Sequence, residues 1–269
     1  MYNIIRSLIL GVFLFAICFC QSKDDSFVNH QKIIQNEFES SYGDGWQFSW
    51  NQNNTPHRIF GKSISQNFDA SDPLQSEISA REFISYNQTL FNISEANLEL
   101  WVNEQNGSLR YLIFNQVYSG IPVWNGRIDF RYSLDGDLVM IGHDAFPNLD
   151  ISTNTSISMD QAIYYSQIHV DFDENLNDEV VGDPELYIWV YHGREPIYHL
   201  AWLTELFVHS TDPDDELPVH RWKIFVDAHS GDILEQFDEV RMATVEGHVS
   251  GPVKDEPYGI ATDRGMPHI

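Results

Sequence analysis

The segment 221–239 constrains the fold most, because it contains the pattern of a complete β-hairpin. Apolar side chains at every second position of Trp222–Val226 are typical of a half-buried strand. His229–Asp232 then has the composition of a turn, since Gly231 can take a positive φ without steric cost. Apolar residues resume at Ile233 on the far side of this turn. The pattern predicts two antiparallel strands late in the chain.

Further helix and strand patterns occupy most of the remaining sequence. Ser79 and Ser158 each precede a helical pattern and have Glu or Gln three residues later, which predicts N-caps at both positions. The polar stretch 66–75 predicts a loop, and Asn106-Gly107 predicts a tight hairpin turn. Helical spacing covers residues 24–41, 79–91 and 158–168, and strand patterns cover 46–50, 58–61, 98–104, 109–118, 121–132, 137–143, 185–191 and 198–208. We therefore expect the α+β fold class.

Composition and charge exclude some classes of protein. The chain has 269 residues, 42% of them hydrophobic and 13% aromatic, which is enough for one large domain or two small ones with real cores. Its 15 basic and 40 acidic residues give a net charge of −25. Such a charge repels nucleic acid and anionic membranes, so we expect no nucleic-acid partner.

The first 20 residues have the pattern of a signal peptide. Arg6 precedes the apolar run Leu8–Phe19, which is too short to span a bilayer, so no transmembrane segment is predicted. The expected location is therefore extracellular. A lipid anchor on Cys20 is the alternative, although Phe19 fits the preceding position poorly. Both cysteines lie in or beside this segment, so the exported chain would contain neither a disulfide nor a thiolate nucleophile.

The hairpin also carries a resemblance to a known family. The segment Trp222–Leu234 resembles the closing hairpin of PepSY domains, where W-x-x-F-V-D-A-x-[ST]-G-x-[IV]-L recurs. PepSY domains form the second half of the propeptides of secreted thermolysin-like zinc proteases. The matching residues that we take as candidate site residues are Trp222, Phe225, Val226, Asp227 and Gly231.

A second motif resembles the fungalysin–thermolysin propeptide (FTP) domain. The segment 116–126 fits Q-x-x-x-G-[IV]-P-V-x-x-[GA], and the Trp46–Gly61 region is similar to the opening of that domain. In physical terms, Gly120 and Pro122 predict a bend in an edge strand, because proline has no N–H for a central ladder. The candidate residues from this motif are Gln116, Gly120, Ile121, Pro122, Val123 and Gly126.

The two resemblances imply an order of domains. They imply an FTP-like domain over 24–150 and a PepSY-like domain over 151–240, after a signal peptide over 1–20. The two units would resemble small cystatin-like folds in tandem, each with a helix packed on a curved antiparallel sheet. Residues 241–269 would be a linker and the start of a truncated β module. The candidate processing region follows the hairpin and includes Glu239, Val240, Arg241 and Gly251.

The sequence contains no recognised catalytic motif. Thermolysin-like catalysis needs H-E-x-x-H, and none of the 11 histidines is followed by glutamate. We interpret His199, His209, His220 and His229 as structural or surface residues. We expect no cofactor in this chain. The resemblance places zinc, with calcium as a second candidate ion, in a protease domain that this sequence does not contain.

The resemblance implies a prosegment of a secreted thermolysin- or fungalysin-like metalloprotease. Such prosegments act as intramolecular chaperones and as inhibitors, and the expected partner is the cognate metalloprotease catalytic domain. A domain that binds the native protease stabilises it by mass action, and covalent linkage raises the effective concentration. The alternative is a stand-alone secreted or lipid-anchored inhibitor or binding protein built from FTP and PepSY domains.

Overall fold

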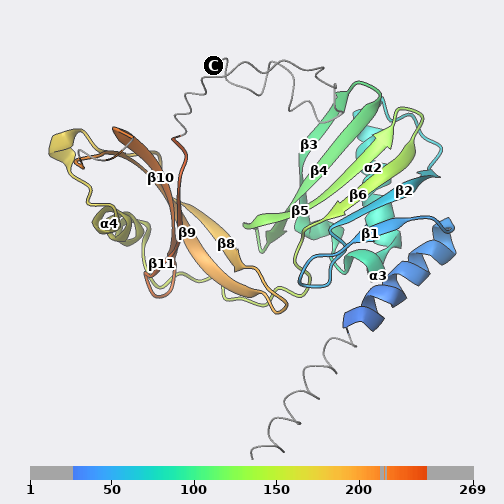
Figure 1. Ribbon diagram of the computed structural model, residues 1–269, viewed down its shortest axis with the longest axis horizontal. Helices are drawn as coiled ribbons and strands as arrows, with labels where there is room; N and C mark the ends of the chain where they lie inside the picture. Colours follow the sequence, from blue (N-terminus) through green and yellow to red (C-terminus); the bar gives the residue numbers. More distant parts are fainter. Residues whose placement is uncertain (1–26, 213–214, 216, 241–269) are drawn as a thin grey trace, which may run out of the picture.

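The protein is an α+β molecule in which helices pack on one large mixed sheet (Figure 1). The computed structural model describes residues 27–212, 215 and 217–240. The predicted fold class is confirmed, whereas the tandem cystatin-like arrangement stays a prediction. The predicted signal peptide and the predicted β module over 241–269 lie outside the described residues.

The N-terminal part, residues 27–150, contributes six antiparallel strands. Gly107 and Ser108 connect two of them directly after Asn106, and Gly107 has a φ of +59°, so the predicted tight hairpin is confirmed. In spatial order the strands are β1 (Gln47–Ser49), β2 (Arg58–Ser65), β6 (Asp137–His143), β5 (Ile121–Ser133), β4 (Leu109–Tyr118) and β3 (Leu98–Asn106).

Helices supply the other side of the N-terminal core. Residues 27–42 are helical, and α2 (Pro73–Tyr86), α3 (Gln88–Phe91) and the short helix η1 (Glu95–Asn97) follow β2. One cluster of buried residues joins these helices to the sheet. Its fully buried members include Ile59, Ile84, Phe91, Phe114, Ile128, Phe130 and Leu138.

The predicted start of the second helix was wrong. Helix α2 begins at Pro73, and its N-cap is Asp72, whose side chain accepts hydrogen bonds from the N–H groups of Leu74 and Gln75. Ser79 lies inside the helix. Proline is favoured at the first helical position, where its missing N–H costs nothing and its φ is already helical. The stretch predicted as a loop therefore contains the first residues of α2.

The C-terminal part, residues 151–240, has a helix on one face of a strongly curved sheet. Helix α4 (Met159–His169) packs against β9 and β10, and the predicted capping box of Ser158 and Gln161 is present. The short helix η2 (Glu174–Leu176) and the two-residue strand β7 (Glu179–Val180) follow α4 in the chain, and β7 pairs with β9. The longer strands are β8 (Glu185–Tyr191), β9 (Ile197–His209), β10 (Val219–Asp227) and β11 (Ile233–Asp238).

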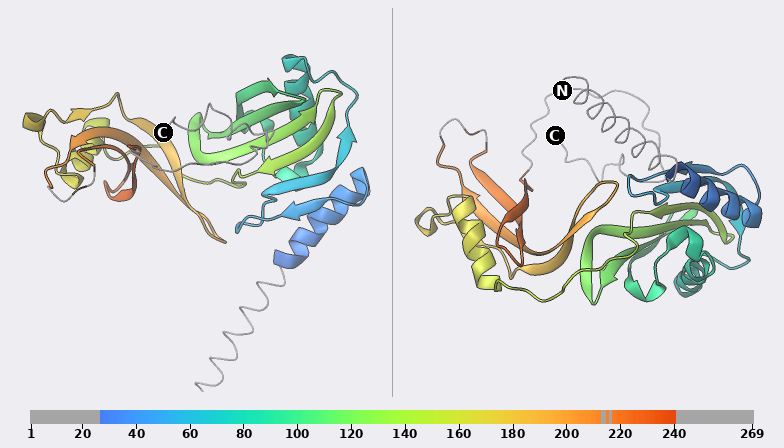
Figure 2. Two further views of the ribbon diagram at one scale, coloured as in Figure 1. Left: turned by 45° about the horizontal axis from the view of Figure 1, so that its top comes forward. Right: turned by 90° about the horizontal axis from the view of Figure 1, so that it is seen from below.

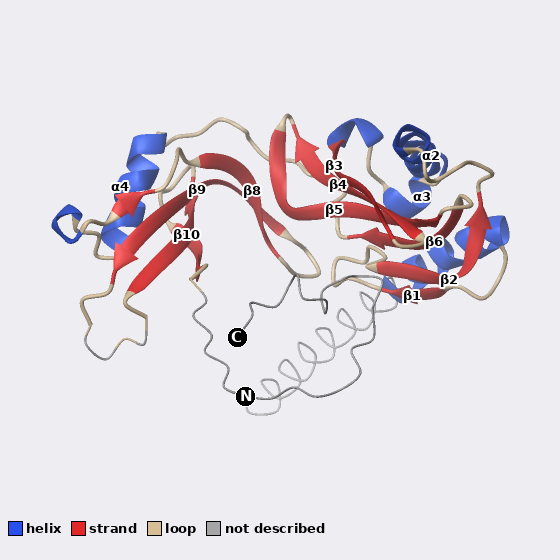
Figure 3. Cartoon of the chain, turned by 90° about the horizontal axis from the view of Figure 1, so that it is seen from above, coloured by secondary structure: helices blue, strands red, loops and turns tan. Residues whose placement is uncertain are grey.

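The two parts join through β5 and β8. These strands run parallel and are paired at Val123 and Ile188 (Figures 2 and 3). Two further clusters of buried side chains draw on both parts: one contains Val123, Phe146 and Ile188, and the other places Trp124 against a group that includes Phe225. The sheet is therefore continuous across the junction.

Candidate functional site

Gln116 of the first motif ties two segments together inside the protein. It is 2% exposed, and its amide makes two hydrogen bonds to the backbone of Phe146: Nε2 donates to the carbonyl at 2.7 Å, and Oε1 accepts from the N–H at 2.8 Å. Gly126 makes room for this arrangement, because a Cβ there would lie 2.8 Å from Gln116 Oε1. Two residues of the motif that are ten positions apart, Gln116 and Gly126, thus act together.

The remaining residues of this motif form the turn and the start of β5. Gly120 has a φ of +79° in the turn between β4 and β5, and Pro122 pairs with Val117 of β4. The predicted edge strand was wrong, because Val123 also pairs with Ile188 of β8. The start of β5 extends beyond β6, and β8 occupies the side that would otherwise be open.

Asp227 of the second motif organises the turn of the β10–β11 hairpin. Its Oδ1 accepts hydrogen bonds from the N–H groups of His229 and Ser230, at 2.8 and 2.9 Å. Its Oδ2 lies 2.7 Å from Nδ1 of His199. Burial raises the pKa of Asp227, but the hydrogen bonds from Ser230, His199 and His229 outweigh it and lower that pKa. The carboxylate therefore has a structural role in the turn.

Gly231 and Trp222 lie on the side of the hairpin that faces α4. Gly231 has the predicted positive φ, +82°, and a Cβ there would lie 2.6 Å from the ring of Tyr165 on α4. The carbonyl of Ala228 accepts hydrogen bonds from the segment that enters α4, and Val226 and Trp222 belong to the cluster beneath that helix. The turn of the hairpin thus packs directly against Tyr165 of α4.

The two motifs meet in space at Trp124. Its ring lies 4.9 Å from the ring of Phe225 and 5.4 Å from that of Tyr187, both in edge-on geometry. Val123 and Ala228 likewise share a buried cluster. Trp124 occupies an unspecified position of the first motif, so the sequence pattern gave no reason to single it out. Residues of both motif segments therefore contribute to the junction of the two parts.

The start of the candidate processing region is held by ion pairs. Glu239 Oε1 lies 2.6 Å from Nζ of Lys223, and the N–H of Val240 donates to Asp238. In the described part of the chain, β11 pairs with β10 alone, so its outer edge is open. Arg241 and Gly251 lie outside the described residues.

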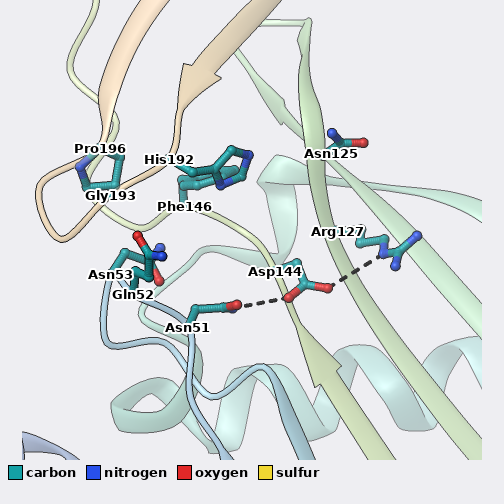
Figure 4. A pocket seen from close by; sticks show the side chains of 10 residues that line it. All are labelled: Asn51, Gln52, Asn53, Asn125, Arg127, Asp144, Phe146, His192, Gly193 and Pro196. Atoms are coloured by element: carbon teal, nitrogen blue, oxygen red, sulfur yellow. Dashed lines mark hydrogen bonds and ion pairs between the residues drawn. The ribbon is translucent and has the colours of Figure 1, made fainter.

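A cavity of about 350 Å³ lies where the two parts face each other (Figure 4). Three connections and β5 surround it: the loop before β2, the segment after β6 and the tip of the β8–β9 hairpin. Sequence reasoning did not find this site, because its residues come from separate segments with no common spacing. They are Asn51, Gln52, Asn53, Asn125, Arg127, Asp144, Phe146, His192, Gly193 and Pro196.

Asp144 is the central polar residue of the cavity wall. Its Oδ1 lies 2.6 Å from Nδ1 of His57 and 3.1 Å from Nδ2 of Asn51, and its Oδ2 accepts from Nη1 of Arg58 at 3.0 Å. Burial raises the pKa of Asp144, but the hydrogen bonds from these three side chains outweigh it and lower that pKa. Asp144 is therefore a charged acceptor whose oxygen atoms are already engaged.

A second carboxylate lies beneath this wall. Asp129 is 6% exposed, and its oxygen atoms lie 3.8 Å from Nη1 of Arg58 and 3.9 Å from Nη2 of Arg131. Burial raises the pKa of Asp129 despite the attraction of these guanidinium groups. Gly142 is required beside it, because a Cβ at that position would overlap the carboxylate.

Three of the predicted structural histidines, His199, His209 and His220, pair with carboxylates, whereas Nδ1 of His229 lies 3.5 Å from Oγ of Ser156. His209 lies 3.1 Å from Asp178, and His220 lies 2.9 Å from Asp215 and 2.8 Å from Asp238. Among the described residues, no group of three or more His, Cys, Asp or Glu side chains could hold a metal ion. Within the same residues, no helix is long and apolar enough to cross a membrane.

Comparisons with known proteins link the chain to bacterial proteases. No family model matches it. It is 24% identical over 171 residues to bacillolysin of Brevibacillus brevis, which covers 62% of this chain and 31% of that protein. It is 23% identical over 248 residues to neutral protease B of Bacillus subtilis (strain 168), which covers 87% of this chain and 41% of that protein. The chain thus spans less than half the length of these curated relatives.

Among solved structures, the C-terminal domain of Bacillus megaterium YpeB matches over 68% of this chain and 71% of that one. The sequence identity is 16% and the TM-score is 0.34, which is too low to assign a fold.

Proposed function

We propose that this chain is the propeptide region of a secreted thermolysin- or fungalysin-like metalloprotease, in which it acts as intramolecular chaperone and inhibitor. The observation that carries the proposal is the similarity to two proteases, each of which is more than twice as long as the matched region. The sequence contains no H-E-x-x-H motif, and the described residues offer no metal site. Zinc, with calcium as a second candidate ion, would belong to the partner catalytic domain.

We propose the domain organisation that the two resemblances imply. An FTP-like domain over 24–150 and a PepSY-like domain over 151–240 would follow a signal peptide over 1–20 and direct the chain to the cell exterior. The contact between Trp124 and Phe225 supports a paired arrangement, because it joins one residue of each motif segment. Residues 241–269 would begin the next module.

The outer edge of β11 is a strand edge that fits an inhibitory role, because it lies directly before the proposed processing region. An open strand edge can add to a partner by β-augmentation, the mode in which an extended peptide pairs with a sheet. Glu239 and Val240 follow this edge directly and lead into the proposed processing region. Covalent linkage to the catalytic domain would make the effective concentration of the inhibitor high until cleavage.

A refolding assay tests both activities. The catalytic domain of neutral protease B is unfolded in urea and refolded with or without the full chain, and the native enzyme is assayed for proteolysis with the chain added. We expect the chain to raise the yield of active enzyme and to inhibit the native enzyme at micromolar concentration. Serum albumin at the same concentration is the control.

The two readings of the chain differ in this assay. A stand-alone inhibitor would inhibit the native enzyme without raising the refolding yield, whereas a propeptide does both. If the chain neither inhibits nor assists, the proposed relationship with a metalloprotease is wrong.

A further inference from the structure

In the wall of the cavity at the junction, the carboxylate of Asp144 is engaged, whereas the guanidinium of Arg127 makes no hydrogen bond to it. Asp144 already accepts from His57, Asn51 and Arg58. Arg127 differs: its Nε lies 3.7 Å from Asp144, beyond hydrogen-bond distance, and 44% of its side chain is exposed. A guanidinium in this position can turn toward a ligand without breaking a hydrogen bond to Asp144.

The electrostatic setting of the cavity differs from that of the whole chain. The net charge of the protein is −25, but at this wall one ionised carboxylate, Asp144, faces the two guanidinium groups of Arg58 and Arg127. The neighbouring carboxylate of Asp129 is buried behind them. Arg58 lies against both carboxylates, so Arg127 is the guanidinium of the cavity lining that an entering anion can meet, in a site partly shielded from solvent.

The neutral residues of the wall are suited to a peptide. Gln52, Asn53 and Asn125 carry amides whose NH2 groups can donate to a peptide carbonyl. The Oδ1 of Asn53 already accepts from Thr55, so Asn53 would contact a ligand through its NH2 group. Phe146 is 3% exposed and so presents little ring surface for a sugar to stack on. A volume of about 350 Å³ is at the lower end of the range of ligand sites, which suits one side chain and its flanking backbone.

We propose that this cavity binds the carboxylate of a peptide, with the guanidinium of Arg127 as its main contact and the amides of Asn53 and Asn125 as contacts for the adjacent peptide groups. The carboxylate can come from an acidic side chain or from a peptide C-terminus. This proposal depends on the cavity alone, so it can hold or fail independently of the proposed protease partnership.

NMR titration of the full, isotope-labelled chain tests the site with three short peptides. N-acetyl-Gly-Glu-Gly amide carries a side-chain carboxylate, N-acetyl-triglycine acid carries a terminal one, and N-acetyl-Gly-Gln-Gly amide carries neither. We expect saturable shifts of the backbone N–H signals of Asn125 and Gly193 with one or both of the acids, and weaker binding at higher salt. The peptide that binds identifies the source of the carboxylate.

Two variants assign the contact. Arg127→Gln removes a charge-assisted hydrogen bond, which corresponds to a loss of affinity of about tenfold or more. Asn125→Gly keeps the positive φ of +60° at this exposed position and removes the amide, so a loss of about threefold is expected while the fold is retained. Arg221→Gln, at an exposed arginine of β10 outside the cavity, is the matched control.

The outcomes separate clearly. Loss of binding in the first two variants, with normal binding in Arg221→Gln and unchanged thermal midpoints, supports the proposal. Equal shifts with the glutamate and glutamine peptides would overturn it, as would unchanged affinity in Arg127→Gln. If Arg127→Gln lowers the thermal midpoint, the affinity of the Asn125→Gly variant is the deciding measurement. An unchanged affinity in Asn125→Gly would reject the amide contact and with it the proposed site.

Discussion

At the scale of single residues, several glycines are fixed by what their neighbours occupy. Gly231 and Gly182 both have a positive φ, +82° and +67°, but they differ in their surroundings. A Cβ at Gly231 would meet the ring of Tyr165, whereas one at Gly182 would have nothing within 4 Å. The sequence predicted the turn at Gly231 from conformation alone, because contact with α4 depends on how distant segments pack.

This pair of glycines gives a direct test of packing against conformation. Gly182→Ala should cost about 1–2 kcal/mol of unfolding free energy, the price of a left-handed L-residue. Gly231→Ala should cost about 1–3 kcal/mol more, because the new methyl group must displace Tyr165. Urea unfolding of both variants measures the difference. Equal losses would show that Tyr165 moves aside freely.

His143 makes the stability depend on pH. It is fully buried; Nε2 lies 3.0 Å from the carbonyl of Phe91, and Nδ1 accepts from the N–H of Ala145, so the ring is neutral. Burial lowers its pKa to about 4. Below pH of about 6.5 the unfolded chain binds a proton that the folded chain does not, so the contribution of His143 to stability is present above that pH and is lost as the pH falls toward 4.

His143→Gln should remove this pH dependence. At about 1.4 kcal/mol per pKa unit, the contribution that is lost on acidification is about 3 kcal/mol. Urea unfolding of both proteins at intervals between pH 7.5 and 4 measures it, and carboxylates that titrate in both proteins cancel in the comparison. We expect the two curves to converge as the pH falls. Parallel curves would contradict the neutral, buried assignment.

At the scale of elements, local signals predicted most helices and strands but misplaced one boundary. The strands 109–118 and 137–143 and the capping box at Ser158 were predicted correctly. The start of α2 was wrong because Ser79 with Glu82 matched a capping box, while Asp72-Pro73 was interpreted as a turn. Both patterns are local. The helix begins at the earlier one, which adds about a turn and a half and packs Ser76 on the core.

Helix α2 should therefore depend on Asp72. Replacing an N-cap aspartate by alanine leaves the first N–H groups without a partner and costs about 0.5–2 kcal/mol. We expect Asp72→Ala to lower the free energy of unfolding by that amount, measured with urea. Asp183→Ala, at an exposed aspartate outside the helices, is the control and should have little effect.

At the scale of the whole molecule, the junction and the cavity were beyond what the sequence could predict. The motifs predicted which segments matter, but the contact of Trp124 with Phe225 joins residues far apart in the chain. The cavity residues Asn51, Asp144 and His192 share neither a motif nor a spacing. Such sites are created by tertiary packing, to which periodicity and turn chemistry are insensitive.

Two tryptophans test how the junction couples the parts. Trp124→Ala should cost at least about 2 kcal/mol, less than the 3–5 kcal/mol typical of a fully buried aromatic, because the ring is partly exposed. We also expect unfolding to separate into two transitions, as the parts lose a shared contact. Trp101→Ala, at a ring that is 63% exposed on β3, should change stability by less than about 0.5 kcal/mol. A single unshifted transition in Trp124→Ala would contradict this role.

The length of β5 has a consequence for what the chain can tolerate. Its first residues meet β8, and its later residues meet β6, so one continuous strand sets the register on both sides of the junction. Deleting one residue between Val123 and Ile128 would turn every preceding side chain to the opposite face. Val123 would then take the orientation of Trp124, and each side chain would face the buried cluster that the other occupies now. The number of residues in β5 therefore fixes its register with both neighbours. Substitutions along the strand can be tolerated, but an insertion or a deletion cannot.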